Sequence, residues 1–196
     1  MSGNPPAIPI LESERLSLTL PDPAAAPRVV RYLTDNREHH ELWSPVPPGG
    51  FFTEAYWVAR LEQARAEFVA GKSMRLFVFG RGNTGGPVLG TCNFSQFVRG
   101  PFQACYLGFA LDQAAVGRGI MQEAAARGIA YAFGELGLHR IMANHVPENE
   151  RSAKLLESLG FVVEGRAKDY LHINGAWRDH VLTSLTNPAW MGTPAS

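Results

Sequence analysis

The sequence predicts one α/β domain, of the α+β kind, in which helices flank a mixed but mostly antiparallel sheet. The chain has 196 residues, of which 45% are hydrophobic, so it can bury one substantial core but is too short for two ordinary domains. Strand-like and helix-like segments follow one another in the order βααβββαβαββ, without an internal repeat. We expect this domain to occupy residues 1–190 and residues 191–196 to form a flexible tail.

The first half of the chain predicts a strand, two helices and an antiparallel meander. Its first strand-like run alternates between apolar and polar residues and stops at Pro21-Asp22-Pro23, which is typical of a helix start. Later runs are separated by short turns that contain glycine, which favours antiparallel neighbours. The expected strands are residues 15–20, 74–79, 87–97 and 103–111, and the expected helices are residues 24–36 and 54–70.

The second half predicts a long helix, a strand, a short helix and a terminal hairpin. Apolar residues at i, i+3 and i+4 spacing run from Ile120 to Leu136, and Gly137 follows as the residue that ends the helix. Gly160-Phe161 closes the short helix, and Asn174-Gly175 is a strong hairpin-turn pair. The other expected elements are a strand at 140–146, a helix at 149–159 and hairpin strands at 162–173 and 177–185.

Charge and cysteine content disfavour several classes of protein. The 18 basic residues are balanced by 18 acidic ones, which argues against sequence-independent binding of nucleic acid. Cys92 and Cys105 lie in apolar strand-like runs, so we expect neither a disulfide framework nor a metal site. The first residues do not resemble a signal peptide, and no segment approaches a membrane span. We therefore expect a cytoplasmic protein with no membrane partner.

The stretch Val116-Gly117-Arg118-Gly119-Ile120-Met121 lies between a predicted strand and the predicted long helix. An anion could bind here, because Gly119 lets a ligand approach the backbone and the first N–H groups of a helix have no partner within it. The stretch has neither the Gly-Lys-Ser/Thr of a P-loop nor the G-x-G-x-x-G pattern of dinucleotide sites. On these local features alone, a phosphate site and an ordinary turn are equally good interpretations.

The order of elements around this turn resembles that of the GNAT acetyltransferase family, whose acetyl-CoA signature is Q/R-x-x-G-x-G/A at this junction. Val116 stands where the signature has Gln or Arg, and Met121 stands where it has Gly or Ala. Both replacements leave the backbone N–H groups that would bind a pyrophosphate. The resemblance implies acetyl-CoA as co-substrate, bound by Phe109, Ala110, Leu111, Val116, Gly117, Arg118, Gly119, Ile120, Met121, Asn149 and Ser152.

Further segments are similar to the RimJ/RimL branch of this family, and above all to its ribosomal-protein-alanine N-acetyltransferases. The similarity extends over residues 12–190 and includes Ala104-Cys105-Tyr106-Leu107-Gly108, His139-Arg140-Ile141-Met142-Ala143-Asn144, Ala167-Lys168-Asp169-Tyr170-Leu171 and Trp177-Arg178-Asp179-His180-Val181-Leu182-Thr183. It implies transfer of an acetyl group to the N-terminal α-amine of a protein partner. In the family case that partner is a small-subunit ribosomal protein beginning with alanine.

Direct transfer through a tetrahedral intermediate requires few catalytic groups. An α-amine has a pKa near 8, so about a tenth of it is neutral at pH 7, and the enzyme mainly has to align it with the thioester. A backbone N–H in the strand at Phe109 to Leu111 would stabilise the oxyanion. The resemblance places Asn149 at the pantetheine and Ser152 near the sulfur, so we expect Ser152 to assist the leaving thiolate, with Tyr170 as second candidate. Asn149 is equally a favoured helix N-cap.

Several ionisable residues could act as the general base, and Glu164 is the preferred one. Asp169 and His172 follow it on the same predicted strand, and Glu38, His39, His40 and Glu41 precede the expected acceptor site. Adjacent histidines cannot easily face one metal, which argues against zinc. The connection from Trp43 to Phe52 is either one wall of the acceptor cleft or a loop packed on the sheet. A covalent intermediate on Cys105 is disfavoured by its apolar strand context.

Two other functions are compatible with the fold. An acetyltransferase acting on a small-molecule amine would need an acidic pocket, and the sequence has no acidic cluster. A non-catalytic ribosome-assembly or regulatory module would not bind acetyl-CoA. No sequence feature indicates an oligomeric state.

Overall fold

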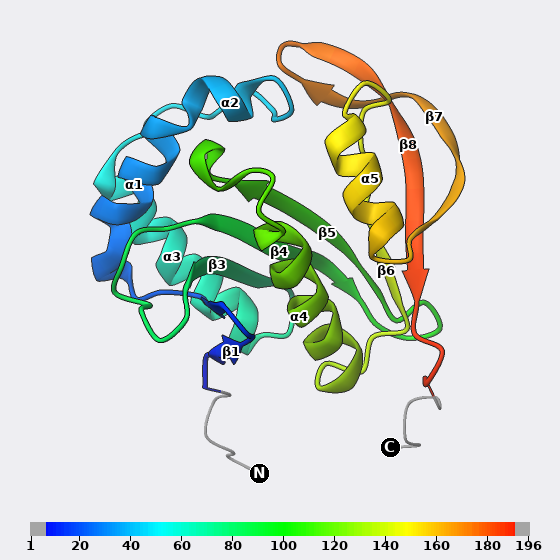
Figure 1. Ribbon diagram of the computed structural model, residues 1–196, viewed down its shortest axis with the longest axis horizontal. Helices are drawn as coiled ribbons and strands as arrows, with labels where there is room; N and C mark the ends of the chain where they lie inside the picture. The colour runs from blue at the N-terminus through cyan, green and yellow to red at the C-terminus, as the bar shows by residue number, and fades with distance from the viewer. Residues whose placement is uncertain (1–6, 191–196) are drawn as a thin grey trace.

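The structure is a computed structural model of the chain and describes residues 7–190. Within these residues an eight-stranded sheet runs through the molecule, with helices on both of its faces (Figure 1). The strands are β1 (Leu11–Glu12), β2 (Leu16–Thr19), β3 (Met74–Gly80), β4 (Gly90–Val98), β5 (Ala104–Leu111), β6 (Arg140–Met142), β7 (Val162–Ile173) and β8 (Ala176–Thr186). The helices are α1 (Ala26–Asp35), α2 (Arg37–Glu41), α3 (Glu54–Val69), α4 (Ile120–Gly134) and α5 (Glu150–Ser158), with two short 3₁₀ turns, η1 (Pro23–Ala25) and η2 (Gln113–Ala115).

The sheet has the strand order β1-β2-β3-β4-β5-β6-β8-β7, and β5 with β6 is its parallel pair. These two strands pair only from Ala104 to Tyr106, opposite Arg140 to Met142. β5 then continues to Leu111 with β4 as its paired neighbour. One edge of β5 therefore carries backbone N–H and C=O groups that are not paired with a strand and are available to a ligand.

Each face of the sheet has its own apolar core. In Figure 1, α4 lies in front of the sheet, whereas α3 lies behind β3. α4 can approach β4 closely because residue 128 is glycine: a Cβ there would lie 2.7 Å from a ring carbon of Phe94. On the other face, α1 and α3 pack around Phe77 and Phe79 of β3. Packing on both faces therefore fixes the sheet from which β5 leads to the glycine turn.

The predicted α+β class and the order of the major elements are confirmed, and β1 and α2 are added to them. The hairpin turn is also confirmed, because Asn174 and Gly175 both have positive φ angles, of 46° and 79°. The helix predicted to reach Leu136 ends at Gly134, although Gly137 has the expected positive φ of 62°. The predicted tail, residues 191–196, lies outside the described residues.

The strand predicted over residues 140–146 is shorter in the structure, where β6 ends at Met142. Beyond this residue the chain leaves β5 but stays close to β8, since the Ala143 N–H donates to the Thr183 carbonyl at 3.0 Å. An isolated bridge between His145 and Val181 continues this contact. The early departure from β5 opens the sheet beside the end of that strand.

Candidate active site

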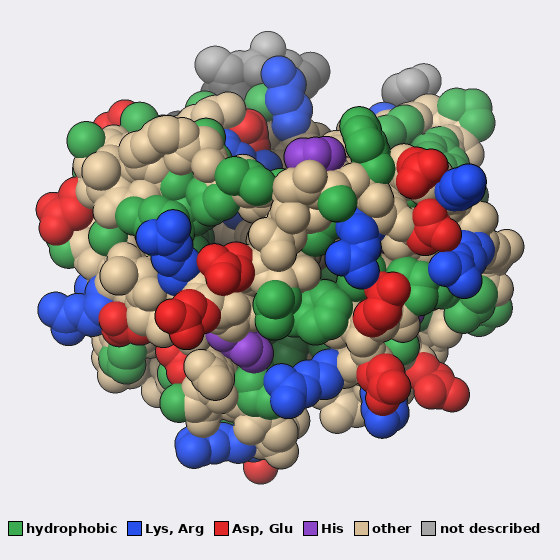
Figure 2. All heavy atoms as spheres, turned by 90° about the horizontal axis from the view of Figure 1, so that it is seen from above, with side chains coloured by type: hydrophobic (Ala, Val, Ile, Leu, Met, Phe, Trp, Pro, Cys, Tyr) green, Lys and Arg blue, Asp and Glu red, His purple; other side chains and the backbone are tan. Residues whose placement is uncertain are grey.

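A cavity of about 590 Å³ lies where the end of β5, the glycine turn before α4, one side of α5 and the segment at α2 meet. Ten of the eleven residues expected to bind the coenzyme line it, and only Arg118 does not. Figure 2 looks onto this end of the molecule, where hydrophobic side chains lie in a hollow bordered by histidine and basic side chains. The structure thus brings segments about 40 residues apart, β5 and α5, to one site.

The glycine turn has the backbone shape that an anion site requires. Gly117 and Gly119 have φ angles of 80° and 73°, a left-handed conformation that suits glycine. Gly119 is the N-cap of α4 and offers no side chain to satisfy the first N–H groups of the helix. These N–H groups and the positive end of the helix dipole therefore remain available to a negatively charged ligand.

Asn149 and Ser152 stand at the start of α5, on the opposite wall of the cavity. The Asn149 Oδ1 accepts a hydrogen bond from the Ser152 N–H at 3.1 Å, so Asn149 is the N-cap of this helix. The Ser152 side chain is half-buried and lines the cavity. Capping thus fixes the backbone of Ser152 beside the space that a ligand would fill.

Glu164 lies on β7 and is not among the residues that line the cavity. Its carboxylate forms an ion pair with Arg140 of β6. Hydrogen bonds from Arg140 and from the Ser184 hydroxyl hold the pKa of Glu164 below its usual range. The structure therefore does not bring the preferred general base to the cavity, and the ion pair makes this carboxylate a weaker base.

Tyr170 also lies outside the cavity lining, at a β-bulge in β7 between Ala167 and Leu171. Its hydroxyl accepts a hydrogen bond from the Asn144 Nδ2 at 3.2 Å. It is also hydrogen-bonded to the hydroxyl of Tyr106, and this bond is the main cause of a raised pKa of Tyr106. Since Tyr106 is the last residue of β5 paired with β6, this cluster marks the point where the two strands part.

His39 and His40 of α2 line the cavity, although their surroundings could not be predicted because α2 carries no apolar periodicity. The His40 Nε2 lies 2.9 Å from the carbonyl oxygen of Leu111 at the end of β5. Burial, then the neighbouring His40 and Arg151, lower the pKa of His39. His39 is therefore neutral at pH 7 and faces the same space as Ser152.

Asn36, which sequence reasoning missed, fixes the loop that joins β5 to the glycine turn. This side chain is 2% exposed. Its Nδ2 donates to the Asp112 Oδ2 at 2.9 Å, and its Oδ1 accepts from the Gln113 N–H at 2.8 Å. A buried asparagine at the end of a helix is ordinarily read as a cap, so only the folded structure shows this contact across the chain.

Metal and covalent chemistry find little support in the side chains of this region. Within residues 7–190, no three His, Cys, Asp or Glu side chains lie close enough together to hold a metal ion. Burial raises the pKa of the Cys105 thiol to about 12. This thiol therefore stays protonated at neutral pH, which disfavours it as a nucleophile.

No helix within residues 7–190 has the length and the apolar run that a membrane crossing requires.

Comparison with known proteins agrees with this geometry. The family described as acetyltransferase (GNAT) domain matches residues 15–162. Over 180 residues the chain is 41% identical to the ribosomal protein uS5-alanine N-acetyltransferase of Escherichia coli (strain K12), with 92% of each protein covered.

Solved structures give the same result. The ribosomal-protein-S5-alanine acetyltransferase from Vibrio fischeri has a TM-score of 0.88 at 38% identity, covering 94% of this chain and 100% of that one. Mycobacterium smegmatis RimJ, solved in complex with CoA-disulfide, has a TM-score of 0.84 at 25% identity, covering 97% and 91%. The resemblance predicted from the sequence is confirmed: the chain belongs to the GNAT acetyltransferase family.

Proposed function

We propose that this protein transfers the acetyl group of acetyl-CoA to the N-terminal α-amine of a ribosomal protein that begins with alanine, the counterpart of uS5. The observation that carries this proposal is the single cavity in which the glycine turn, the end of β5 and the start of α5 meet. The E. coli relative, 41% identical over 92% of both proteins, is named for this activity. Such an acceptor would place the enzyme in the cytoplasm.

The shape and chemistry of the cavity fit the parts of acetyl-CoA. The pyrophosphate would lie at the glycine turn, against the backbone N–H groups of Gly119 and the first turn of α4. The pantetheine would lie along the free edge of β5, with Phe109 and Leu111 on one side and Leu155 of α5 on the other. The thioester carbonyl would then be within reach of a backbone N–H of β5, which serves as the oxyanion donor.

Ser152 is our candidate for the group that assists the departing thiolate. It lines the cavity at the end where α5 begins, and the cap provided by Asn149 holds it there. Tyr170 is the second candidate. Its hydroxyl oxygen accepts a hydrogen bond from the Asn144 Nδ2 at 3.2 Å, so its own proton remains free to be donated to another group. That proton could be directed to the acceptor or to a water beside it.

For removal of the amine proton, His39 is better placed than Glu164. His39 lines the cavity and has a pKa below its usual value of 6.5, so at pH 7 it is an unprotonated acceptor. Glu164 is paired with Arg140 instead. Because a fraction of any α-amine is already neutral at pH 7, a base that acts through water is sufficient.

A small-molecule amine is a weaker candidate as acceptor. Polyamines and aminoglycoside-like compounds are recognised by carboxylates, but none of the described residues that line the cavity is Asp or Glu. The charged side chains there are instead Arg151 and Lys154, which suit the phosphates of the coenzyme. The rim of the cavity thus favours an anionic co-substrate and an acceptor that binds through more than its charge.

The proposal is tested by incubating the protein with acetyl-CoA and a synthetic peptide that begins with alanine and follows the N-terminus of the uS5 counterpart. Intact-mass analysis should show the addition of one acetyl group. The matched control is the same peptide with its α-amine blocked, which should remain unchanged even if it contains lysine. Acetylation of the blocked peptide, or of polyamines in preference to the free peptide, would contradict the proposal.

A further inference from the structure

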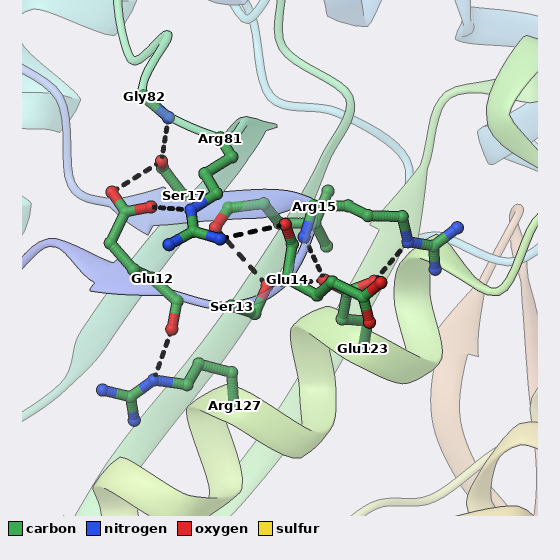
Figure 3. A network of polar contacts seen from close by, with 10 residues as sticks. Glu12, Ser13, Glu14, Arg15, Ser17, Arg81, Gly82, Glu123 and Arg127 are labelled. Atoms are coloured by element: carbon green, nitrogen blue, oxygen red, sulfur yellow. Dashed lines mark hydrogen bonds and ion pairs between the residues drawn. The ribbon is translucent and has the colours of Figure 1, made fainter.

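Arg15, in the turn between β1 and β2, is held by the first turn of α4 (Figure 3). Its Nε lies 2.6 Å from the Glu123 Oε2, and its backbone N–H donates to the Glu123 Oε1 at 2.7 Å. The hydroxyl of Ser13 donates to the same Oε1 at 2.7 Å. Three donors from one turn thus converge on a single carboxylate that is only 18% exposed, so the position of the Arg15 side chain is well determined.

The far end of Arg15 contacts the glycine turn. Its Nη1 donates to the carbonyl oxygen of Arg118 at 3.0 Å. Its Nη2 lies beside Gly119, where a Cβ would meet it at 3.5 Å. Gly117 and Gly119 line the cavity and Arg118 does not, so the guanidinium supports the turn from the side away from the cavity.

This contact determines the direction of a backbone N–H that the coenzyme would use. In a trans peptide unit the C=O and the following N–H point in opposite directions. Because the Arg118 carbonyl is directed at Arg15, the Gly119 N–H is directed to the other side, toward the cavity. Gly119 at one end of this peptide unit makes it easier to rotate, since glycine has few steric restrictions on its φ angle. An external hydrogen bond is therefore needed to keep it in one orientation.

We propose that Arg15 is a positioning residue for the co-substrate: it holds the Arg118–Gly119 peptide in the orientation that binds the pyrophosphate, and Glu123 holds Arg15 in place. This inference rests on the proposed function and extends it to a residue about 100 positions before the turn. Arg15 acts through the backbone of the turn and not by direct contact with a phosphate. Its guanidinium is suited to this because one planar group donates both to Glu123 and to the carbonyl.

The test compares two acyl donors, acetyl-CoA and S-acetylpantetheine, which lacks the pyrophosphate. The substitution Arg15→Met should weaken coenzyme A binding in calorimetry and lower kcat/KM for acetyl-CoA, each by about 10-fold, the effect of one hydrogen bond to the backbone. kcat/KM for S-acetylpantetheine should stay at the wild-type value. The dependence of coenzyme affinity on salt concentration should also be unchanged, because no charge contact to phosphate is lost.

Arg81→Met is the matched control. Arg81 belongs to the same surface network in Figure 3, where it pairs with Glu12 at 3.7 Å and donates to the Glu14 carbonyl at 3.3 Å. It does not contact the turn, so its loss should leave both donors unaffected. Arg15→Lys keeps the charge but loses the planar guanidinium with its several N–H donors. This variant should therefore show most of the loss of coenzyme A affinity seen with Arg15→Met.

Three outcomes would overturn the inference. They are wild-type coenzyme affinity in Arg15→Met, an equal loss with both donors, and full affinity in Arg15→Lys, which would show that charge alone is needed. A wild-type protein that fails to bind coenzyme A would instead contradict the proposed function. Thermal unfolding of each variant confirms that the fold is intact, and Arg15 is suited to substitution because its side chain is 48% exposed.

Discussion

At the scale of single residues, the site depends on a few side chains whose positions are fixed by backbone contacts. Ser152 faces the cavity because Asn149 caps α5 one turn earlier. His39 faces it because the next residue, His40, is anchored to the Leu111 carbonyl. In both cases an ordinary structural bond of one residue orients the chemically useful neighbour, so capping and catalysis are compatible roles.

Substitution of Ser152 by alanine tests its role at the leaving thiolate. We expect kcat to fall about 10- to 100-fold with little change in coenzyme affinity, because the hydroxyl acts as the thiolate departs. Calorimetry with coenzyme A and steady-state kinetics separate the two effects. Ser95→Ala is the control, since Ser95 of β4 is half-buried like Ser152 but does not line the cavity. Parallel losses of binding and turnover in Ser152→Ala would point to a structural role only.

The choice of general base is tested by the pH dependence of kcat/KM. A base must be unprotonated, and the lowered pKa of His39 keeps it so to a pH below its usual 6.5. The wild-type rate should therefore fall on acidification through that lower pKa, in addition to the fall caused by protonation of the amine. His39→Ala should remove this acid limb and lower the rate about 10-fold or more. Glu164→Gln should leave the profile unchanged, and a large loss of rate in that variant would restore Glu164 as the base.

At the scale of elements, the glycine turn and α4 form one unit with the β1–β2 turn. The φ angle of Gly119 is 73°, which a β-branched residue cannot adopt without strain. Glu123, one turn into the helix, ties this unit to Ser13 and Arg15. The proposed anion site is thus a property of the packed helix start and not of the hexapeptide alone.

Gly119→Val should abolish measurable coenzyme binding while the protein remains folded. The new side chain would strain the backbone and crowd the Arg15 guanidinium, so the N–H groups of the turn would lose their common direction. Gly71→Val provides a matched control: Gly71 has a similar φ of 64°, open space around it and a place at the end of α3 away from the cavity. Calorimetry and circular dichroism together decide the result. Coenzyme affinity in Gly119→Val equal to that of the control would exclude the turn as the pyrophosphate site.

The Glu123 carboxylate should make the stability of this unit dependent on pH. Burial opposes its ionisation, but hydrogen bonds from the Arg15 N–H, the Ser13 hydroxyl and the Arg15 guanidinium outweigh burial and lower its pKa. A lowered pKa gives stability that is present above the unfolded value, near 4.3, and is lost as the pH falls through the folded value. Glu123→Gln should therefore cost about 1 kcal/mol at pH 7 and progressively less as the pH falls below about 4 and through the folded value, as measured by urea unfolding.

The control for this experiment is Glu150→Gln. Glu150 pairs with Lys154 on α5, but both side chains are about four-fifths exposed, so this pair contributes little at any pH. The free energy of unfolding of Glu123→Gln could differ from that of the wild type by the same amount at every pH. Such a result would show that Arg15 and Ser13 do not hold the carboxylate in its charged form.

At the scale of the whole molecule, the elements that could be predicted from the sequence are those that a few neighbouring residues specify by themselves. The periodic apolar runs of β3, β4, β5 and α4, and the Asn174-Gly175 turn, are each specified within a few residues, and these predictions are confirmed. α2 was missed because its five residues, Arg37–Glu41, have no apolar side chain to show a period. β6 was predicted too long because its end depends on when the chain leaves β5, which is a tertiary property.

The candidate site likewise has some features that short local motifs predict and others that depend on tertiary contacts. The segments that line the cavity could be predicted because the glycine turn and the Asn149–Ser152 pair are short motifs at element boundaries. Glu164 was preferred as a base because its partner Arg140, 24 residues earlier, could not be identified from the sequence. Arg15 and Glu123 are 108 residues apart, and nothing in either local sequence indicates their contact. The surroundings of residues that depend on such distant pairings can be read only from the folded structure.

The most direct test of the proposed function is to locate the acetyl group on the unmodified uS5 counterpart after reaction with this protein and acetyl-CoA. Fragmentation mass spectrometry of the product should place a single acetyl group on the α-amine of the N-terminal alanine. The Gly119→Val protein should give no product under the same conditions. Acetyl groups on lysine side chains with a free α-amine, or an unmodified protein after prolonged incubation with the wild-type enzyme, would contradict the proposed function.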